Sequence, residues 1–515
     1  MFRYLRALAF TVLLGLISLN CRGENLRLGQ VTVQSAVAVE QSSLQERLKS
    51  LSGEEITESL LQKVLDQVNE HYRNRGYPSS VAYFPHQQST DGDLKVDVLI
   101  PKLGMLKFSY RLMLTEDTRE RLFDPLMSFV GERDDGRLWE RLRNLAALDS
   151  IHILGLEDDL TKAFPDSNAL KLIVHSASDY YVQGFFDNHG SKAAGRYRAG
   201  LYAQANNLTR HADSASLFVA RSSEAQDNFS LSYKLPLNSY ATLLGASLCY
   251  SNYELGEQYR KLGAQGHSLT ASLFLAQPLY NTRSPYLNRE RAYKGTLELA
   301  GRYRQLTDEF KTYSLKFKKH TSALSLSFTH ESKDPGFYNW EAAAVLTCGQ
   351  LKNDDEWELG NEGSYTVFNA SFTGDWAFPS YRQLHFRNNT ELQYSSSDLD
   401  SSERFEAGGP KAVGAFSPGA ASGDSGYLQQ LSLRWYYDTF YLEPHFDVAH
   451  VKVNSRDSST LKGLGLQLGA YHGGLKVSVD LNHALGGRGE GESGTQLWLR
   501  LSYGKAFGGQ MTPYF

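Results

Sequence analysis

Cysteine is nearly absent from the sequence. Three cysteines occur in 515 residues, and only Cys249 and Cys348 lie beyond the N-terminal segment. Two thiols are too few for the disulfide framework that stabilises many small exported domains. The sequence allows either one bridge between them or two unrelated thiols. We favour two unrelated thiols.

The sequence also has no large excess of charge of one sign, and it has no recognisable catalytic motif. The net charge is −4, which leaves no basic footprint for nucleic acid. The nucleotide-binding pattern Gly-x-x-x-x-Gly-Lys-Ser/Thr does not occur, and no nucleophile is paired with a base. His445 and His450 would point to opposite faces of a strand, which argues against a shared metal. We therefore expect no enzyme activity, no cofactor, no metal and no nucleic-acid partner.

Long apolar runs are confined to the N-terminus. The mostly apolar segment Ala7–Leu19 follows Arg3 and Arg6 and is too short to span a membrane as a helix. This pattern predicts a signal peptide over residues 1–23, with cleavage after Gly23. No later window of roughly 18 apolar residues occurs, so no transmembrane helix is expected. An exported chain of this kind is either soluble or a β-barrel.

Aromatic residues and glycine are abundant, with 30 Tyr, 26 Phe and 44 Gly. From residue 178 to residue 515, apolar and polar residues alternate in segments of about ten residues, which is typical of an outer-membrane barrel. In the clearest segment, Leu475, Val477, Val479 and Leu481 alternate with Lys476, Ser478, Asp480 and Asn482. About sixteen such segments predict a transmembrane β-barrel of about sixteen antiparallel strands with an aqueous lumen. Charges on the polar sides argue against a soluble β-sandwich or propeller.

Residues 24–177 show a different pattern, in which helices alternate with strands. The clearest helix is predicted over Thr57–Asn74, where Thr57 can cap the start and Gly76 and Pro78 end it. A second unit has predicted helices near Glu116–Val130, with a kink at Pro125, and near Arg137–Ala147. Two small α+β domains of the form βααββ fit these residues.

Four passages, in order along the chain, resemble the transporters of two-partner secretion, the TpsB family. They are "YRNRGYPSSVAYFPHQQSTDGDLKVDVL" at 72–99, "RLWERLRNLAALDSIHILGL" at 137–156, "FFDNHGSKAAGRYRAGLYAQANNL" at 185–208, and "GGPKAVGAF" with "SGDSGY" between residues 408 and 427. The first two are similar to the two POTRA domains of that family. The third is similar to the start of its barrel and the fourth to its sixth extracellular loop.

The resemblance implies an architecture and a function. Residues 24–104 and 105–177 would be POTRA domains, and residues 178–515 would be the barrel, with an inward-folding loop at about 402–427. The protein would lie in the bacterial outer membrane with its N-terminal domains in the periplasm. It would bind a large, unfolded, TpsA-like β-helical exoprotein and pass it through the barrel to the cell surface. Its other expected partners are outer-membrane lipid and the barrel assembly machinery, and we expect a monomer.

Two alternative functions are less consistent with the sequence. A barrel-assembly or insertion factor of the same superfamily usually has three to five POTRA domains, whereas only two fit here. It also keeps an arginine in the loop, and the absence of this arginine is awkward for both functions. A passive porin would lack the N-terminal domains. The sequence does not identify the cargo, which could be a haemolysin, an adhesin or a contact-dependent toxin.

The loop departs from the family pattern at its tip. The family's Val-Arg-Gly/Ala-Tyr/Phe aligns with Val413, Gly414, Ala415 and Phe416, so glycine replaces the arginine. In the family that arginine pairs with an aspartate on the wall of the thirteenth strand, which aligns here with Asp447. Our hypothesis is that Lys411, Arg404 or Arg434 replaces it as the partner of Asp447. The alternative is that Asp447 is only hydrated.

Other loop residues are expected to shape its turns. Gly408, Gly409, Pro410, Gly423 and Asp424 would supply tight turns in a confined lumen. The first strand is predicted to begin near Leu28, which leaves no room for the plug helix found in many family members. The loop would then be the main obstruction of the pore.

The end of the last strand is ambiguous in the sequence. Alternation ends near Phe507, although the chain ends in Phe515, as outer-membrane barrels commonly end in Phe. We favour Phe507 as the last strand residue.

Overall fold

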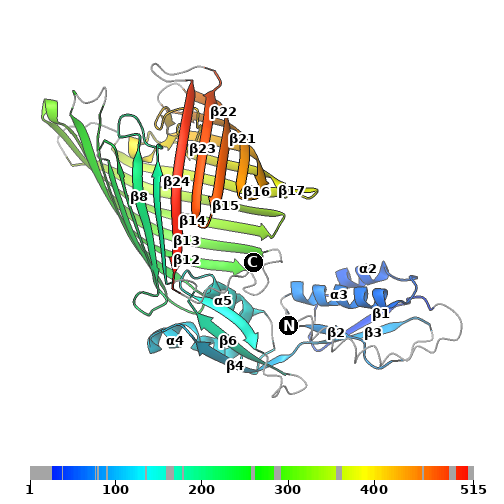
Figure 1. Cartoon of the computed structure of the whole chain (residues 1–515). Helices are drawn as coiled ribbons and strands as arrows, with labels where there is room; N and C mark the ends of the chain where they lie inside the picture. Colours follow the sequence, from blue (N-terminus) through cyan, green and yellow to red (C-terminus); the bar gives the residue numbers. More distant parts are fainter. Residues whose placement is uncertain are drawn as a thin grey trace. The chain divides into compact units, whose positions relative to one another are not determined.

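The computed structural model describes residues 26–508 apart from 38, 76, 78–79, 88–90, 134–135, 158–166, 177–178, 225, 257–260, 262, 283–291, 355–361, 455–457 and 487–493. The predicted signal peptide and Phe515 lie outside the described residues. The chain forms two compact units (Figure 1). Among the described residues, one unit comprises those within 26–109, 124–142 and 155–173, and the other comprises those within 110–123, 143–154 and 174–508.

The N-terminal domain is a three-stranded sheet with two helices. Its strands β1 (Val31–Ser35), β2 (Val81–Tyr83) and β3 (Leu94–Leu99) lie in the order β1-β3-β2, and its helices are α2 (Ser42–Lys49) and α3 (Glu58–Asn74). The predicted cap is confirmed, because the Thr57 hydroxyl accepts a hydrogen bond of 3.2 Å from the Leu60 N–H. Val64, Val68 and Tyr72 of α3 are fully buried in the core, as the apolar face of the helix requires.

A second small sheet follows, made of β4 (Lys102–Tyr110), β5 (His152–Glu157) and β6 (Ser167–His175) in the order β4-β6-β5. The helices here are α4 (Glu116–Leu122), the 3₁₀ helix η1 (Asp124–Phe129) and α5 (Arg137–Ala146). The predicted helix over 116–130 is therefore two helices, because the chain changes to 3₁₀ geometry around Pro125. Across the described residues, every helix is too short or too polar to cross a membrane.

The rest of the chain is a closed antiparallel barrel of sixteen strands (Figure 1). The last strand pairs with the first, with Ser502 opposite Phe185, so no edge is left open. The strands are β7 (Tyr180–Asp187), β8 (Arg198–Asn206), β9 (Ser214–Ser222), β10 (Asp227–Pro236), β11 (Leu243–Glu254), β12 (Ala264–Asn281), β13 (Ala292–Phe310), β14 (Leu315–Asp334), β15 (Tyr338–Asn353), β16 (Gly363–Phe378), β17 (Tyr381–Ser395), β20 (Ser425–Tyr437), β21 (Phe440–Lys452), β22 (Ser458–His472), β23 (Leu475–Ala484) and β24 (Thr495–Phe507). The described part of the last strand thus ends at Phe507, the residue we favoured.

Alternation assigns each side chain to one face of the barrel. Leu466, Leu481 and Leu499 are exposed on the outer face, at 42%, 51% and 42%. The residues between them face the lumen. We call the end of the barrel at which β7 begins the proximal end, and the opposite end the distal end.

The two cysteines are free and lie on opposite faces. Cys249 faces the lumen, with its Sγ 3.2 Å from the Ser230 hydroxyl, whereas Cys348 is exposed on the outer face. A bridge between them is excluded because the barrel wall separates the two thiols.

Candidate functional site: the loop inside the barrel

A loop of residues 396–424 joins the distal ends of β17 and β20 and folds back into the lumen. It contains a 3₁₀ turn, η5 (Ser401–Glu403), and a two-residue hairpin of β18 (Phe405–Glu406) and β19 (Ser422–Gly423). The Ala407 N–H donates to the Ala421 carbonyl over 2.9 Å and extends the hairpin toward the tip. The tip of the loop is more buried than most of the barrel, because Val413 and Ala415 are 0% exposed and Phe416 is 2% exposed.

An apolar cluster holds the tip against one side of the lumen. The loop contributes Phe405, Val413 and Phe416 to it. The wall of β20, β21, β22 and β23 contributes Leu428, Ala449, Val451, Leu461 and Ala484. Burying this apolar patch of the wall provides a hydrophobic driving force for docking the loop.

Gly414 docks through its backbone. Its N–H donates to Asp447 Oδ2 over 3.3 Å, and its carbonyl accepts a 2.7 Å hydrogen bond from Trp498 Nε1. A Cβ at this position would lie 2.3 Å from Asn482 Oδ1. Glycine is therefore what allows this close approach between the loop and the wall.

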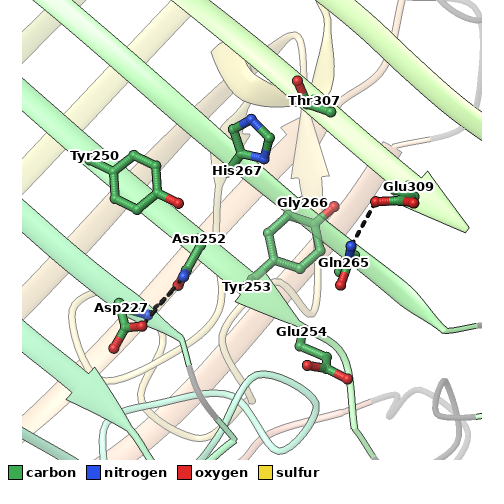
Figure 2. Close-up of a pocket in the computed structure, with 10 residues that line it drawn as sticks. All are labelled: Asp227, Tyr250, Asn252, Tyr253, Glu254, Gln265, Gly266, His267, Thr307 and Glu309. Atoms are coloured by element: carbon green, nitrogen blue, oxygen red, sulfur yellow. Dashed lines mark hydrogen bonds between the residues drawn. The ribbon is translucent and has the colours of Figure 1, made fainter. Parts of the chain in front are cut away.

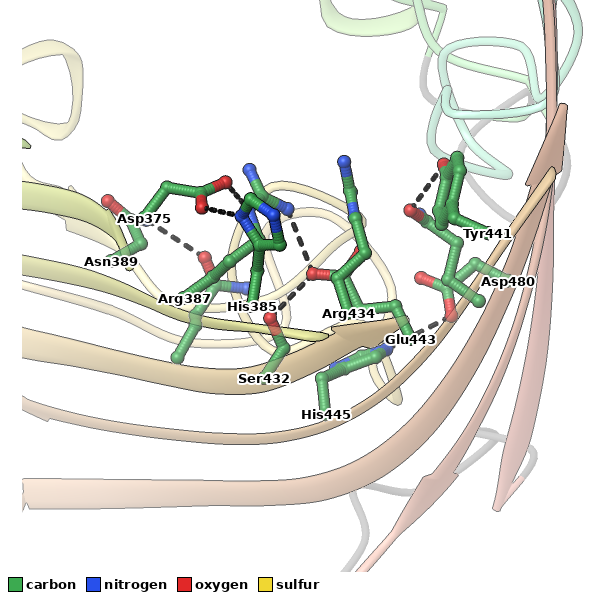
Figure 3. Close-up of polar contacts among 12 residues, drawn as sticks. Asp375, His385, Arg387, Asn389, Ser432, Arg434, Tyr441, Glu443, His445 and Asp480 are labelled. Carbon is green, nitrogen blue, oxygen red and sulfur yellow. Dashed lines mark hydrogen bonds and ion pairs between the residues drawn. The ribbon is translucent and has the colours of Figure 1, made fainter. Parts of the chain in front are cut away.

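His445 is the neighbour of Asp447 on the wall. The Asp447 side chain is 1% exposed, and its Oδ1 lies 3.2 Å from His445 Nδ1 and 3.3 Å from Gln430 Nε2. The other ring nitrogen of His445 lies 3.0 Å from Asp480 Oδ1 (Figure 3). The imidazole therefore bridges two carboxylates. Gln430 Nε2 also donates to the Ala412 carbonyl over 2.7 Å, which joins the carboxylate to the loop a second time. The alternative of a merely hydrated Asp447 does not fit these contacts.

The prediction that Lys411, Arg404 or Arg434 pairs with Asp447 was wrong. Arg404 pairs with Asp424, with 3.2 Å between Nε and Oδ1. Arg434 pairs with Glu443 over 2.5 Å. Lys411 is exposed and makes no ion pair among the described residues. Sequence reasoning favoured long side chains, whereas His445 reaches Asp447 because it lies two residues away on the same face of β21.

Arg434 belongs to a separate polar network toward the proximal end (Figure 3). Glu443 accepts from Arg434, from Arg387 over 2.8 Å and from the Ser432 hydroxyl over 2.5 Å. The Arg434 guanidinium also lies 4.1 Å from the centre of the Tyr441 ring. Each buried charge here is paired, as charges in a confined lumen require.

Arg404 closes the base of the loop instead. Its partner Asp424 is fully buried and also accepts from the backbone N–H groups of Leu399 and Asn454, each over 2.8 Å. These contacts tie both ends of the loop to each other and to the segment that follows β21.

The residues expected to form turns lie along the two arms of the loop. Gly409 has a φ of +104°, a conformation that favours glycine, and its N–H donates to the Phe416 carbonyl over 3.1 Å. Gly408 bridges to Val413, and Pro410 lies half-buried between these two residues. Gly423 is the second residue of β19.

A second anchor, which the sequence analysis missed, holds the start of the loop. Glu403 accepts from Arg302 over 2.8 Å and from Arg304 over 3.2 Å, and Lys319 Nζ lies 2.6 Å from Asp400 Oδ2. The arginines lie on β13 and the lysine on β14, so the wall supplies the cations and the loop the carboxylates. Arg302 and Arg304 alternate with outward residues, and this spacing of two was the signal that could have identified them.

A polar hollow at the distal ends of β10 to β13 lies outside the lumen (Figure 2). Tyr250, Asn252 and Glu254 line it and alternate with the lumenal residues of β11, so they point to the outer surface. The Asp227 N–H donates to Asn252 Oδ1 over 2.6 Å there. The hollow is thus separated from the loop by the barrel wall.

Comparisons with known proteins agree with this architecture. Residues 167–472 match the family described as haemolysin secretion/activation protein ShlB/FhaC/HecB, and residues 26–100 match a ShlB-type POTRA domain. The heme/hemopexin transporter protein HuxB of Haemophilus influenzae (strain 86-028NP) is 23% identical over 408 residues, which cover 76% of this chain and 69% of HuxB.

Two solved structures share the fold. CdiB from Escherichia coli has a TM-score of 0.68 at 17% identity and covers 95% of this chain and 92% of its own. BamA from Haemophilus ducreyi lacking POTRA domains 1–3 has a TM-score of 0.52 at 13% identity, with 93% and 100% covered.

Proposed function

Because the chain belongs to the ShlB/FhaC/HecB family of haemolysin secretion/activation proteins, we propose that its lumenal loop is the gate of the transport pathway. Family membership makes the protein an outer-membrane transporter that secretes a partner exoprotein. Its N-terminal POTRA-type domains lie in the periplasm. The proximal end of the barrel therefore faces the periplasm and the distal end faces the cell exterior. The family is a class of transporters and not of enzymes, and we propose that this chain performs no catalysis.

The main evidence for a gate is the way Gly414 docks on the wall. Its N–H and carbonyl are held by Asp447 and Trp498, which come from two different strands of a closed wall. A peptide backbone anchored at both polar groups is immobilised, and the apolar cluster beside it excludes water. The loop thus obstructs the lumen, and passage of a cargo requires these contacts to loosen.

We also propose the nature of the cargo and the boundaries of the domains. We propose a large, β-helical exoprotein that enters unfolded, and a transporter that works as a monomer and is assembled by the barrel assembly machinery. The match to the haemolysin secretion/activation family supports an exoprotein as the cargo. We propose residues 1–23 as signal peptide, 24–104 and 105–177 as POTRA domains, and 178–515 as the barrel, with the gating loop at 402–427.

Substitution of Asp447 tests the gate. Asp447→Ala leaves the Gly414 N–H without its charged acceptor, and the loss of such a bond costs about 1.5–3 kcal/mol. The docked loop should then open at least about tenfold more often. The measurements are the fraction of time spent at high conductance in planar bilayers, and surface display of the partner exoprotein. Asp227→Ala, which removes a carboxylate on the outer face, is the matched control.

Two results would contradict the proposal. If Asp447→Ala and wild-type protein open equally often, the Gly414 contact does not hold a gate. If the exoprotein reaches the surface equally well in cells that lack the transporter, this chain is not its transporter.

A further inference from the structure

A lumenal cavity of about 530 Å³ lies between the two attachments of the loop to the wall. The wall strands that line it are β15, β16 and β17, and the loop contributes Arg404, Phe405 and Glu406. The apolar cluster draws the tip of the loop to the wall of β20 to β23, whereas the second anchor holds its start on β13 and β14. Between these two attachments the loop leaves β15 and β16 uncovered.

Short, uncharged side chains of β15 and β16 line one part of the wall of this cavity, and Glu391 and Gln393 of β17 line the rest. Alternation directs Ala343 and Val345 of β15 and Asn369 and Ser371 of β16 into the lumen. None of the four is charged, and Ser371 is exposed to the cavity. The β15 and β16 part of the wall therefore offers weak hydrogen bonds and little steric hindrance to a chain that contacts it, and Glu391 adds one negative charge beside it.

The loop side of the cavity presents a strand edge. β18 pairs with β19 on one side only, and its residues Phe405 and Glu406 line the cavity. The free edge of a strand offers backbone N–H and carbonyl groups to an extended peptide.

At the distal end of the cavity, hydrogen bonds join the wall to the docked loop. Gln393 Nε2 donates to the carbonyls of Glu403 and Asp424, over 2.9 and 3.2 Å, and so ties the wall to both arms of the loop. Gln393 itself is 7% exposed. A chain that enters from the proximal end would stop below this crosslink.

We propose that this cavity is the loading site for the cargo, where an extended segment lies along β15 and β16 before the loop is released. The inference rests on the proposed transport function and adds a defined place and order to it. An extended chain occupies roughly 160 Å³ per residue in a slot about 4.8 Å by 10 Å. The cavity therefore accommodates roughly three residues, enough to position a chain against the edge of β18 and the Gln393 crosslink.

Filling the cavity tests the proposal without knowledge of the natural cargo. The probe is an unstructured peptide of about 30 Ser, Thr, Asn and Gly residues, added to the proximal side of full-length protein in planar bilayers. Wild-type protein should show transient current blockades. Ala343→Trp places an indole in the cavity and should reduce the blockade rate at least tenfold. Ala344→Trp, its neighbour on the outer face, should leave the rate unchanged.

A second measurement keeps the result interpretable if Ala343→Trp perturbs folding. Ser371→Cys, in a background with Cys249→Ser and Cys348→Ser, is labelled with a maleimide in the presence and absence of the peptide. The peptide should slow labelling at Ser371→Cys and leave Ser216→Cys, a lumenal site on β9, unaffected. Equal blockade by Ala343→Trp and wild type, or protection at Ser216→Cys alone, would overturn the loading site. Neither result bears on secretion of the exoprotein in cells, which tests the transport function separately.

Discussion

At the scale of single residues, Gly414 changes how the loop is held. The resemblance to the family suggested that the loss of an arginine had to be offset by another cation that reaches Asp447. Instead, the loop presents its own peptide groups to Asp447 and Trp498, and His445 stands beside the carboxylate on the wall. A side chain at position 414 would have to occupy the space that Asn482 fills. The glycine at position 414 and the wall residues Asp447, Asn482 and Trp498 are therefore sterically matched to one another.

Gly414→Ala should loosen the docked loop. A Cβ 2.3 Å from Asn482 Oδ1 forces the two apart, and overpacking of this kind costs about 1–3 kcal/mol. We expect the loop to open about five- to 150-fold more often, measured as the high-conductance fraction in planar bilayers. Gly301→Ala is the control, because a Cβ there meets nothing within 4 Å. Asn482→Ala should rescue Gly414→Ala, and an additive double mutant would contradict the steric explanation.

His71 should make the N-terminal domain sensitive to acid. Burial lowers the pKa of His71, although its Nε2 lies 2.8 Å from the Glu40 carbonyl, and the nearby Arg75 and Arg47 lower it further. Because the pKa is lower in the folded state than its unfolded value of about 6.5, unfolding takes up a proton. The stability of the folded N-terminal domain therefore does not depend on His71 titration above about pH 6.5. It decreases as the pH falls below this value, because the unfolded state then binds a proton that the folded state does not.

Hydrogen exchange of the α3 amides in the full-length protein measures this effect. After correction for the intrinsic exchange rates, the α3 amides should be less protected at about pH 5.5 than at about pH 7.5. In His71→Gln the difference between the two pH values should disappear. A wild-type protein whose α3 protection is equal at both pH values would contradict the prediction.

At the scale of elements, the loop is held by two chemically different attachments. The tip docks through an apolar cluster and backbone hydrogen bonds, whereas the start docks through Glu403 and Asp400 to the cations of β13 and β14. Ion pairs weaken as salt screens them, and apolar contacts do not. High salt is therefore expected to act on the start of the loop rather than on its tip.

Deletion of Gly408–Gly426 should raise the conductance of the pore sharply. The deletion removes the tip and its apolar contacts, and β17 still pairs with β20 from Tyr427 opposite Leu392 onward. Single-channel recording measures the change, and heat-modifiable migration on gels verifies that the barrel is closed. If conductance stays at the wild-type value, the loop is not the main obstruction.

At the scale of the whole molecule, the barrel and the N-terminal domain are stabilised by different means. The barrel closes through the pairing of β24 with β7 and needs no other element to satisfy its strand edges. The N-terminal domain has its own buried cluster, built from both helices and the three strands of its sheet. Each can therefore be changed with limited effect on the other.

Removal of residues 24–104 should separate transport from pore formation. We expect the truncated protein to insert, to remain heat-modifiable and to conduct, because no barrel strand is lost. Surface display of the exoprotein should fall to the level of cells that lack the transporter, since the periplasmic binding region is gone. Undiminished display would show that residues 24–104 are not needed to capture the cargo.

Local patterns were sufficient for much of this structure. Period-two alternation predicted the sixteen-stranded barrel because successive side chains of a strand face lipid and lumen in turn. Thr57 and the apolar face of α3 were predictable for the same reason, since capping and helical spacing act within a few residues. Both predictions concern neighbours in the chain, and the structure confirms them.

Contacts between distant segments were decided only by the tertiary structure. Gly414, Asp447, Asn482 and Trp498 meet because barrel closure and loop docking bring the loop to three separate strands. The same closure places Arg302 and Arg304 beside Glu403. Alternation predicts whether each of these side chains faces the lumen or the lipid, but it does not predict which residue it contacts. The sequence by itself thus determined the barrel and the family, whereas the partners of the gating loop depend on how strands far apart in the chain are aligned around the lumen.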